Sequence, residues 1–318
     1  MNTSGSDTPA LIGIGDLVAD VVVHIPTLPV TSGDFFLADA FEVEAGGTAN
    51  FLIMAARLGA PAVAMGSVGA DRWGSEVAEI LQSEGVDLSL VSPAGTTTRA
   101  LVLVDEEGNH AFAGKFGEGE SIQFGQAYED ALKRAGGIFA SGYSLGEEHL
   151  AELTLQVMRA AGKMGVLRAF DPGPAFAGIT DEVQIEALSL TDILLVNEEE
   201  LQGISPEGIE ALFEYVASMV VLKLGSGGCE IYQADGHVVR SPGFSVPVVD
   251  TTAAGDSFAA AFLRGLTAGL SVQACALFAN AVGASKVQKL GGGRNVPLKQ
   301  EVETLLAASG LDYPSELK

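Results

Sequence analysis

Short apolar runs alternate along the chain with segments whose large apolar residues recur at helical spacing. The apolar runs predict strands at 10–23, 61–68, 137–140, 166–170, 193–196, 219–224, 230–233 and 237–240. The helical spacing predicts helices at 48–58, 73–84, 127–134, 147–161, 206–217, 254–268, 272–289 and about 298–307. Strands that alternate with helices over most of a chain indicate an α/β fold with a mainly parallel sheet and helices on both faces.

Two β-rich pieces, at about 15–45 and 96–117, do not fit this alternation. Within the second piece, 99–104 and 110–116 are predicted to form a hairpin, because the residues between them have the composition of a tight turn. The two pieces together predict a small separate sheet. Such a sheet can act as a lid over ligands, which bind at the carboxyl ends of the strands in folds of this class.

The length of 318 residues suits one large α/β domain, with or without a small appendage. No apolar run reaches the ~18 residues of a membrane span, so no membrane partner is expected. The polar start at 1–9 lacks a signal pattern and is expected to be a disordered tail. Cys229 and Cys275 stand far apart in apolar settings, which favours a reducing cytoplasm over a disulfide framework or a metal cluster.

The formal net charge is −24, from 41 acidic and 17 basic residues. This argues against nucleic acid as a partner, because no basic stripe is available to neutralise its phosphates. Any phosphate ligand must then be held by backbone amides, a metal ion and a few well-placed cations. The charge itself is attributed to solubility or to an environment that favours acidic surfaces.

The segment 250–258 carries the most informative chemistry. Helical spacing of the apolar residues after Asp256 puts this acid in the first turn of a helix. The small residues Ala253, Ala254 and Gly255 leave the amides of that turn uncovered, which makes an anion site. A carboxylate there suits a base that takes a proton from a hydroxyl attacking a phosphate. The alternative is an ordinary first-turn acid with small residues chosen for packing.

Two further segments offer groups for a polyhydroxyl ligand. Asp16 and Asp20 lie in the first apolar run, where acids need hydrogen-bonding partners unless they face water at a sheet edge. Gly46 and Gly47 form a turn that lets the backbone approach a ligand, and Asn50 offers a donor and an acceptor. A plain helix start explains the second segment equally well.

Two other strand ends offer groups for a nucleotide. Asn197 and Glu200 share one face of a helical turn and can hold Mg²⁺ through its waters, although acidic helix N-termini are common. Lys223 precedes a glycine turn and supplies a cation for nucleotide phosphates. The glycines concerned are Gly225, Gly227 and Gly228.

Taken together, these residues resemble the ribokinase-like, or PfkB, family of carbohydrate kinases over about 10–308. The segment 250–256 is similar to the family's C-terminal signature, in which the last Asp is the catalytic base, although the pattern most often has Gly where Ala253 stands. Gly46, Gly47 and Asn50 match the family's sugar-binding glycine pair and Asn, and Asp20 matches its sugar-binding strand acid. Asn197 and Glu200 match the magnesium motif, and Lys223 with its glycines matches the nucleotide loop. The segment 280–295, which contains Asn280 and Gly291, resembles the part that encloses adenine.

The resemblance implies a three-layer α/β/α sandwich with a β lid and an enzyme that uses ATP and Mg²⁺. The γ-phosphate would pass to a primary hydroxyl of a ribose- or fructose-type sugar, with Asp256 as base and the amides of Ala254, Gly255 and Asp256 as an anion hole. The carbonyls of Asp250 and Thr252 are candidate ligands for a monovalent cation such as K⁺. Lids in this family commonly pair, so a homodimer is expected.

The acceptor is judged from the cations near the predicted lid, which are only Arg99 and Lys115. So few cations favour a neutral sugar or a nucleoside over phosphorylated or acidic acceptors. Arg168, at another strand end, either reaches the pocket or, as we expect, forms a salt bridge at the sheet edge.

Two rivals from other classes remain. One is a nicotinamide-dependent oxidoreductase, suggested by Gly13 and Gly15 after a strand, although position 18 is Val where that pattern needs glycine. The other is a sugar-binding protein that has lost catalysis. Retention of Asp256 argues against it, because a pure binder gains nothing from a carboxylate beside phosphate.

Overall fold

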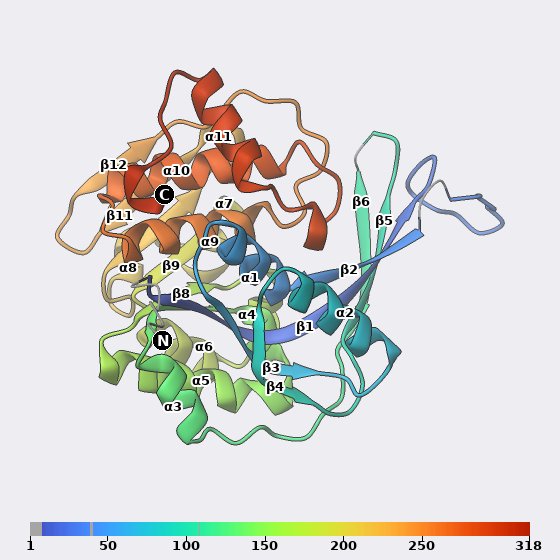
Figure 1. The fold of residues 1–318 in the computed structure, drawn as a ribbon, viewed down its shortest axis with the longest axis horizontal. Helices are drawn as coiled ribbons and strands as arrows, with labels where there is room; N and C mark the ends of the chain where they lie inside the picture. Colours follow the sequence, from blue (N-terminus) through green and yellow to red (C-terminus); the bar gives the residue numbers. More distant parts are fainter. Residues whose placement is uncertain (1–7, 39–40, 108) are drawn as a thin grey trace, which may run out of the picture.

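The computed structural model describes residues 8–38, 41–107 and 109–318. Its central sheet has the strand order β12-β11-β10-β9-β8-β7-β1-β3-β4 (Figure 1). Strands β10, β9, β8, β7, β1, β3 and β4 run parallel, and β11 and β12 are antiparallel at one edge. The bounds are β1 Ala10–His24, β3 Ala62–Val68, β4 Asp87–Pro93, β7 Ala135–Ser141, β8 Leu167–Asp171, β9 Ile193–Asn197, β10 Met219–Lys223, β11 Cys229–Gln233 and β12 Val238–Ser241.

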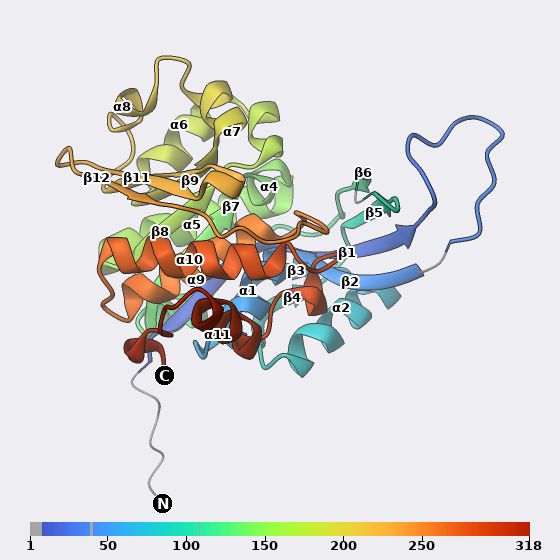
Figure 2. The ribbon, with the colours of Figure 1, turned by 90° about the horizontal axis from the view of Figure 1, so that it is seen from above.

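Helices cover both faces of this sheet, which makes three layers (Figure 2). One face packs against α1 (Thr48–Arg57), α2 (Arg72–Ser83), α9 (Ala254–Thr267), α10 (Val272–Lys286) and α11 (Lys299–Ala308). The other packs against α3 (Gln126–Leu132), α4 (Gly142–Gly146), α5 (Glu148–Met164), α6 (Asp181–Ser189), α7 (Glu198–Ile204) and α8 (Ile209–Leu212).

The central strands are apolar throughout because both of their faces are buried. In β9, Ile193 and Leu195 belong to one apolar cluster, while Leu194 and Val196 belong to the other. Successive side chains of a strand point to opposite faces, so a strand with helices on both sides needs a continuous apolar run. The strands predicted from such runs are therefore found close to their predicted positions.

A second, smaller sheet stands beside the core, and we call it the lid (Figures 1 and 2). It consists of residues 17–24 of β1 together with β2 (Phe41–Gly47), β5 (Arg99–Val104) and β6 (His110–Lys115). The first part of β1 pairs with β3 and β7 in the core, so one strand runs through both sheets. The inner lid face carries a small apolar cluster of Val22, Val102 and Val104, against which Leu290 packs.

The observed elements differ from the prediction in several places. The predicted helix at 206–217 is reduced to α8, because Gly208 adopts φ 107° at its start and only a short turn follows. Strand β4 was not predicted, since it is a half-exposed edge strand with a mixed sequence. Helix α6 was also missed because two acids in its first turn leave few large apolar residues to reveal its spacing.

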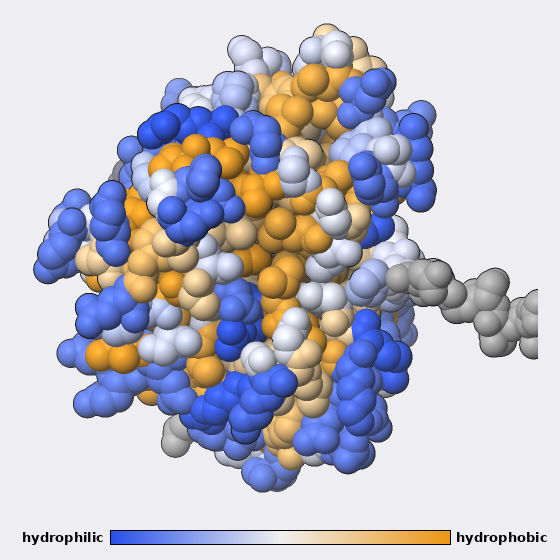
Figure 3. All heavy atoms as spheres, turned by 90° about the vertical axis from the view of Figure 1, so that its left-hand side faces the viewer, coloured by the Kyte–Doolittle hydropathy of each residue, from blue (hydrophilic) through white to orange (hydrophobic). Residues whose placement is uncertain are grey.

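The predicted tail at 1–9 lies, up to residue 7, outside the described residues. No helix in the described part of the chain combines the length and apolarity needed to cross a membrane. Both cysteines are buried and free. On the face toward the left of Figure 1, hydrophilic residues form the margins and hydrophobic ones gather along the middle (Figure 3).

Candidate active site

Asp256 lies in the first turn of α9, as its sequence pattern predicts. Its Oδ2 accepts a hydrogen bond of 3.1 Å from Nδ2 of Asn50 in α1. The Asn50 Oδ1 accepts in turn from the amide of Gly293 at 2.8 Å, which fixes the orientation of the Asn50 amide. Three distant parts of the sequence therefore meet at the Asp256 carboxylate.

The backbone before Asp256 leaves two amides free. Ala253 has φ 61°, and among the described residues it is the sole non-glycine with positive φ. The amide of Ala254 donates to Thr251 O at 3.1 Å, whereas those of Gly255 and Asp256 have no acceptor in the described part of the chain. These two amides, at the positive end of a 14-residue helix, can bind an anion.

The carboxylates at this site have high pKa values. Burial and the charge of Asp171 raise the pKa of Asp256 to about 7, against the effect of the Asn50 hydrogen bond. Burial, Asp256 and Glu44 likewise raise the pKa of Asp20 to about 7. A carboxyl group with a pKa near neutrality can take a proton from a hydroxyl and later release it.

Gly46 and Gly47 make room for this acidic pair. A Cβ at Gly46 would overlap the carboxylate of Asp20, and one at Gly47 would press on the Val18 side chain. Gly47 also has φ 60° where the chain enters α1. The glycine pair thus allows Asp20 to lie against the turn that leads to Asn50.

The carboxyl ends of β8, β9 and β10 bring a second set of charges together. Lys223 Nζ contacts Asp171 Oδ2 at 2.6 Å, and Lys223 is directly in register with Asn197 on β9. Asn197 caps α7 through the Glu200 amide, and Glu200 Oε2 accepts from the Asn197 amide, each at 2.8 Å. Burial and the charge of Asp171 raise the pKa of Glu200, whereas the charge of Lys223 lowers it in part.

A cavity of about 450 Å³ opens beside Gly255 and Lys223. Gly225, Gly228 and Asn280, which the sequence analysis assigned to a nucleotide site, line this cavity, and Gly227 belongs to the same turn. The sequence did not single out the rest of the lining, which includes Phe244, Val246, Val248, Phe258 and Val287. The apolar walls and polar ends of this cavity are typical of a small-molecule site.

Asp250, Thr252 and Gly291 form a separate cluster behind the anion site. The Asp250 carboxylate accepts from the amides of Thr252 at 2.8 Å and Gly291 at 2.6 Å. Burial alone would raise the pKa of Asp250, but these hydrogen bonds outweigh it and lower the pKa. Gly291 therefore holds Asp250 and does not line the cavity where it was expected. The Asp250 carbonyl accepts a hydrogen bond from Lys286 Nζ.

Asp16 is not in the same group as Asp20. It lies where β1 passes from the core to the lid, next to Glu147 and Thr98. Burial raises the pKa of Asp16, and burial together with Asp16 raises that of Glu147 to about 10. Burial therefore favours the protonated form within this pair of acids, which lies beside His149.

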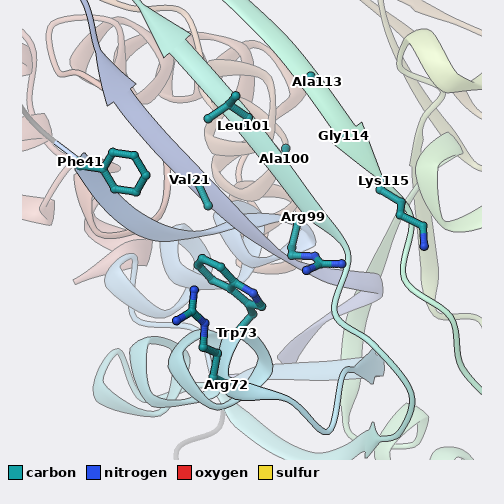
Figure 4. Close-up of a pocket in the computed structure, with 10 residues that line it drawn as sticks. All are labelled: Val21, Phe41, Arg72, Trp73, Arg99, Ala100, Leu101, Ala113, Gly114 and Lys115. Atoms are coloured by element: carbon teal, nitrogen blue, oxygen red, sulfur yellow. The ribbon is translucent and has the colours of Figure 1, made fainter. Parts of the chain in front are cut away.

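Arg99 of β5 and Lys115 of β6 are paired with each other across the lid hairpin (Figure 4). Pairing aligns Arg99 with Ala19 and with Lys115, whereas Asp20 aligns with Ala100. Residues paired in register share a face, so these two cations point away from Asp20. They line an open hollow of about 600 Å³ together with Arg72 and Trp73 of α2.

Several groups near the site were not predicted. Asp171 could have been found as an acid at the end of an apolar run, three residues after Arg168. Arg168 itself forms a salt bridge with Asp192, as expected. Tyr143, 45% exposed, is close enough to the carboxylates of Asp256, Asp171, Glu200 and Asp20 for them, with burial, to raise its pKa.

Comparisons with known proteins identify relatives that span nearly the whole chain. Residues 14–299 match the pfkB family carbohydrate kinases. An ATP-dependent ribose-1-phosphate kinase of Halopiger xanaduensis is 31% identical over 304 residues, which cover 93% of this chain and 98% of the relative. A nucleoside kinase of Methanothermobacter thermautotrophicus is 28% identical over 320 residues, covering 97% and 99%.

The structure of Arabidopsis thaliana ribokinase complexed with ribose and ATP superposes with a TM-score of 0.80 and 27% identity. The match covers 94% of this chain and 98% of the ribokinase. This likeness confirms the predicted ribokinase-like fold, with its mainly parallel sheet between two layers of helices. The chain therefore belongs to the pfkB family of carbohydrate kinases.

Proposed function

We propose that the protein transfers the γ-phosphate of ATP to a primary hydroxyl of a small neutral sugar of the ribose or fructose type. The observation that carries this proposal is the Asp256 carboxylate, which lies beside two free amides at a helix N-terminus. A carboxylate would repel a bound phosphate and is useful there only if it also accepts a proton.

In this proposal, Asp256 takes the proton of the acceptor hydroxyl while the hydroxyl oxygen attacks the γ-phosphorus. The bond between that phosphorus and the bridging oxygen of ADP breaks, and ADP leaves. The free amides of Gly255 and Asp256 stabilise the charge on the transferring group, which for one such donor is typically worth about 3–4 kcal/mol. The amide of Ala254 contributes less than the sequence suggested, because it already donates to Thr251. Asp20 and Asn50 hold acceptor hydroxyls, and the lid excludes water.

The nucleotide would occupy the cavity of about 450 Å³, with its phosphates directed toward Lys223 and Gly255. Mg²⁺ fits this site on chemical grounds. Asp171 and Glu200 repel each other, as the raised pKa of Glu200 indicates, and a divalent cation would offset that repulsion. When bound, Mg²⁺ neutralises phosphate charge, and Glu200 and Asn197 would hold it through water.

The charges of the lid support a neutral acceptor. The inner face near Asp256 presents Asp20 and Glu44, and the latter is already paired with Arg294. Arg99 and Lys115 are on the opposite face. An anionic acceptor would meet mainly carboxylates here and bind poorly.

A nucleoside is the second candidate acceptor. The observation that favours it is the half-exposed Tyr143 among the site carboxylates, because an aromatic ring can stack on a base. Both candidates present a primary hydroxyl, so the same catalytic groups would serve them.

The lid also supports a homodimer as the working assembly. Its strands and the preceding loop expose large apolar side chains, including Phe35, Phe41 and Phe112 at 83%, 69% and 56%. Such residues on a projecting sheet are suited to packing against a second copy. Light scattering coupled to size exclusion tests this, and a monomer at all concentrations would contradict it.

The decisive experiment measures ADP release from Mg-ATP with ribose, fructose, other hexoses, nucleosides, ribose 1-phosphate and keto-deoxy sugar acids. The Asp256→Asn variant is assayed in parallel. We expect turnover with a neutral sugar or a nucleoside and its loss in the variant. Sugar binding by calorimetry without turnover on any acceptor would instead identify a catalytically silent binder.

A further inference from the structure

A lysine is completely buried behind the anion site. Lys286, in the last turn of α10, has 0% of its surface exposed. Its Nζ donates to the Asp250 carbonyl at 3.1 Å and to the Lys289 carbonyl at 2.9 Å. A lysine ammonium is seldom buried so fully, because leaving water is costly unless carbonyls or carboxylates replace its hydration.

The Asp250 carbonyl is also one of the two expected ligands of a monovalent cation. That cation would need the carbonyl oxygen that now accepts from Lys286. An ammonium group and a monovalent metal ion carry the same charge, and two such cations on one oxygen would repel each other. The residues present therefore do not fit an exchangeable cation.

We propose that the Lys286 ammonium is the permanent cation of this site, and that it takes the place of the exchangeable K⁺ that the resemblance to the family implies. The kinase is then independent of monovalent cations. The binding part of this proposal stands on the contacts of Lys286 alone, and only its activity readout rests on the proposed function.

The position of Lys286 explains what such a cation does. The chain runs from Asp250 through Thr251 and Thr252 to Ala253, whose φ of 61° turns it into α9. By holding the Asp250 carbonyl, the ammonium ties this turn to the end of α10. Lys286 is thus a positioning residue for the free amides of Gly255 and Asp256 and makes no contact with the reacting groups.

Both contacts of Lys286 Nζ are made to carbonyl oxygens, which only accept hydrogen bonds. An ammonium group has three N–H donors and no acceptor, so these surroundings suit the charged form. The nearby Asp250 carboxylate favours that form as well.

Thermal unfolding and turnover, each measured in KCl, NaCl and tetramethylammonium chloride at equal ionic strength, test the proposal. For the wild-type protein we expect the same Tm in all three salts and kcat within about twofold. Lys286→Ala loses a charged hydrogen bond to the Asp250 carbonyl. In tetramethylammonium chloride its kcat should therefore be lower than that of the wild type by about tenfold or more. KCl should restore much of that kcat and raise the Tm of this variant.

Lys289→Ala is the matched control, since its side chain pairs with Glu301 at the surface while its carbonyl remains for Lys286. It should behave like the wild type in each salt. If Lys286→Ala does not fold, Lys286→Met fills the same volume without the charge and is measured in its place.

Strong activation or a Tm increase of the wild type by KCl would overturn the proposal. So would a Lys286 variant with normal kcat and no response to KCl. If no acceptor supports turnover, the proposed function fails, yet the Tm comparison still decides whether Lys286 replaces the cation.

Discussion

The Asn50 side chain bridges Asp256 and the backbone of Gly293, donating to the carboxylate at 3.1 Å and accepting from the amide at 2.8 Å. Because the amide nitrogen faces Asp256, the hydrogen bond stabilises the ionised carboxylate and opposes the effect of burial on its pKa. Asn50 thus helps to set the protonation state of Asp256, in addition to any contact with a sugar.

Replacing Asn50 by Ala should shift the pH dependence of turnover. For the wild type, kcat/KM should fall as the pH decreases through about 7, where Asp256 becomes protonated. Loss of the Asn50 hydrogen bond raises the pKa of Asp256, so the fall should begin about one pH unit higher. Asn280→Ala, which alters the cavity proposed for the nucleotide, should leave the pH at which kcat/KM falls unchanged. An Asn50→Ala profile without a shift would exclude a role of Asn50 in setting the pKa of Asp256.

Asp256→Asn should lower kcat by about a thousandfold or more, a range typical for loss of a general base. It should also change stability. The pKa of Asp256 is raised from 3.8 to about 7, so the native state holds its proton more tightly than the unfolded state. Wild-type stability therefore falls as pH rises between these values, and the variant should have the higher Tm at pH 8.

The stability advantage of Asp256→Asn should shrink as the pH is lowered toward 5, which thermal unfolding across that range can show. Asp312→Asn, at an exposed acid, serves as the control and should not alter the pH dependence. Equal Tm differences at every pH would mean that Asp256 ionises normally.

Gly46→Ala should damage the acceptor site selectively. The added methyl group would overlap the Asp20 carboxylate, so Asp20 or the turn must move. A displacement of this kind commonly costs about a hundredfold in rate. We expect a higher KM for the acceptor or a lower kcat, with ATP binding by calorimetry unchanged. Gly125→Ala, where a Cβ meets nothing within 4 Å, is the matched control.

Lys223→Met should weaken both stability and ATP binding. It leaves Asp171 beside Glu200 and Asp256 without the ammonium that contacts it at 2.6 Å. We expect the free energy of unfolding, measured in urea, to fall by about 1–3 kcal/mol. Adding Asp171→Asn should recover part of this loss, because the unpaired carboxylate is removed. Strictly additive effects of the two substitutions would show that the pair is not coupled.

Local patterns in the sequence identified the parts of the site that depend on neighbouring residues. The place of Asp256 in a first helical turn and the reciprocal contacts of Asn197 with Glu200 follow from spacings of a few residues. The core strands were predictable for a similar reason, since burial on both faces requires an unbroken apolar run.

Long-range pairing decided the rest. Arg99 points away from the site because the pairing of β5 with β1 aligns it with Ala19 and not with Asp20. A shift of this pairing by one residue would turn the Arg99 side chain toward the site. Asp16 and Asp20 are four residues apart on β1, a spacing that puts two side chains on the same face of a regular strand. They are nevertheless separated, because Asp16 belongs to the part of β1 that pairs with the core and Asp20 to the part that pairs with the lid. The burial of Lys286 follows from how α10 packs, which its own segment does not reveal.

The passage of β1 through both sheets has a mechanical consequence. Residues 11–16 are hydrogen-bonded to β3 and residues 17–23 to β2, with no loop between the two stretches. Along this strand no loop separates the lid from the core. Any movement of the lid must therefore bend a strand of the central sheet, so the position of the lid and the geometry of the core strands are mechanically coupled.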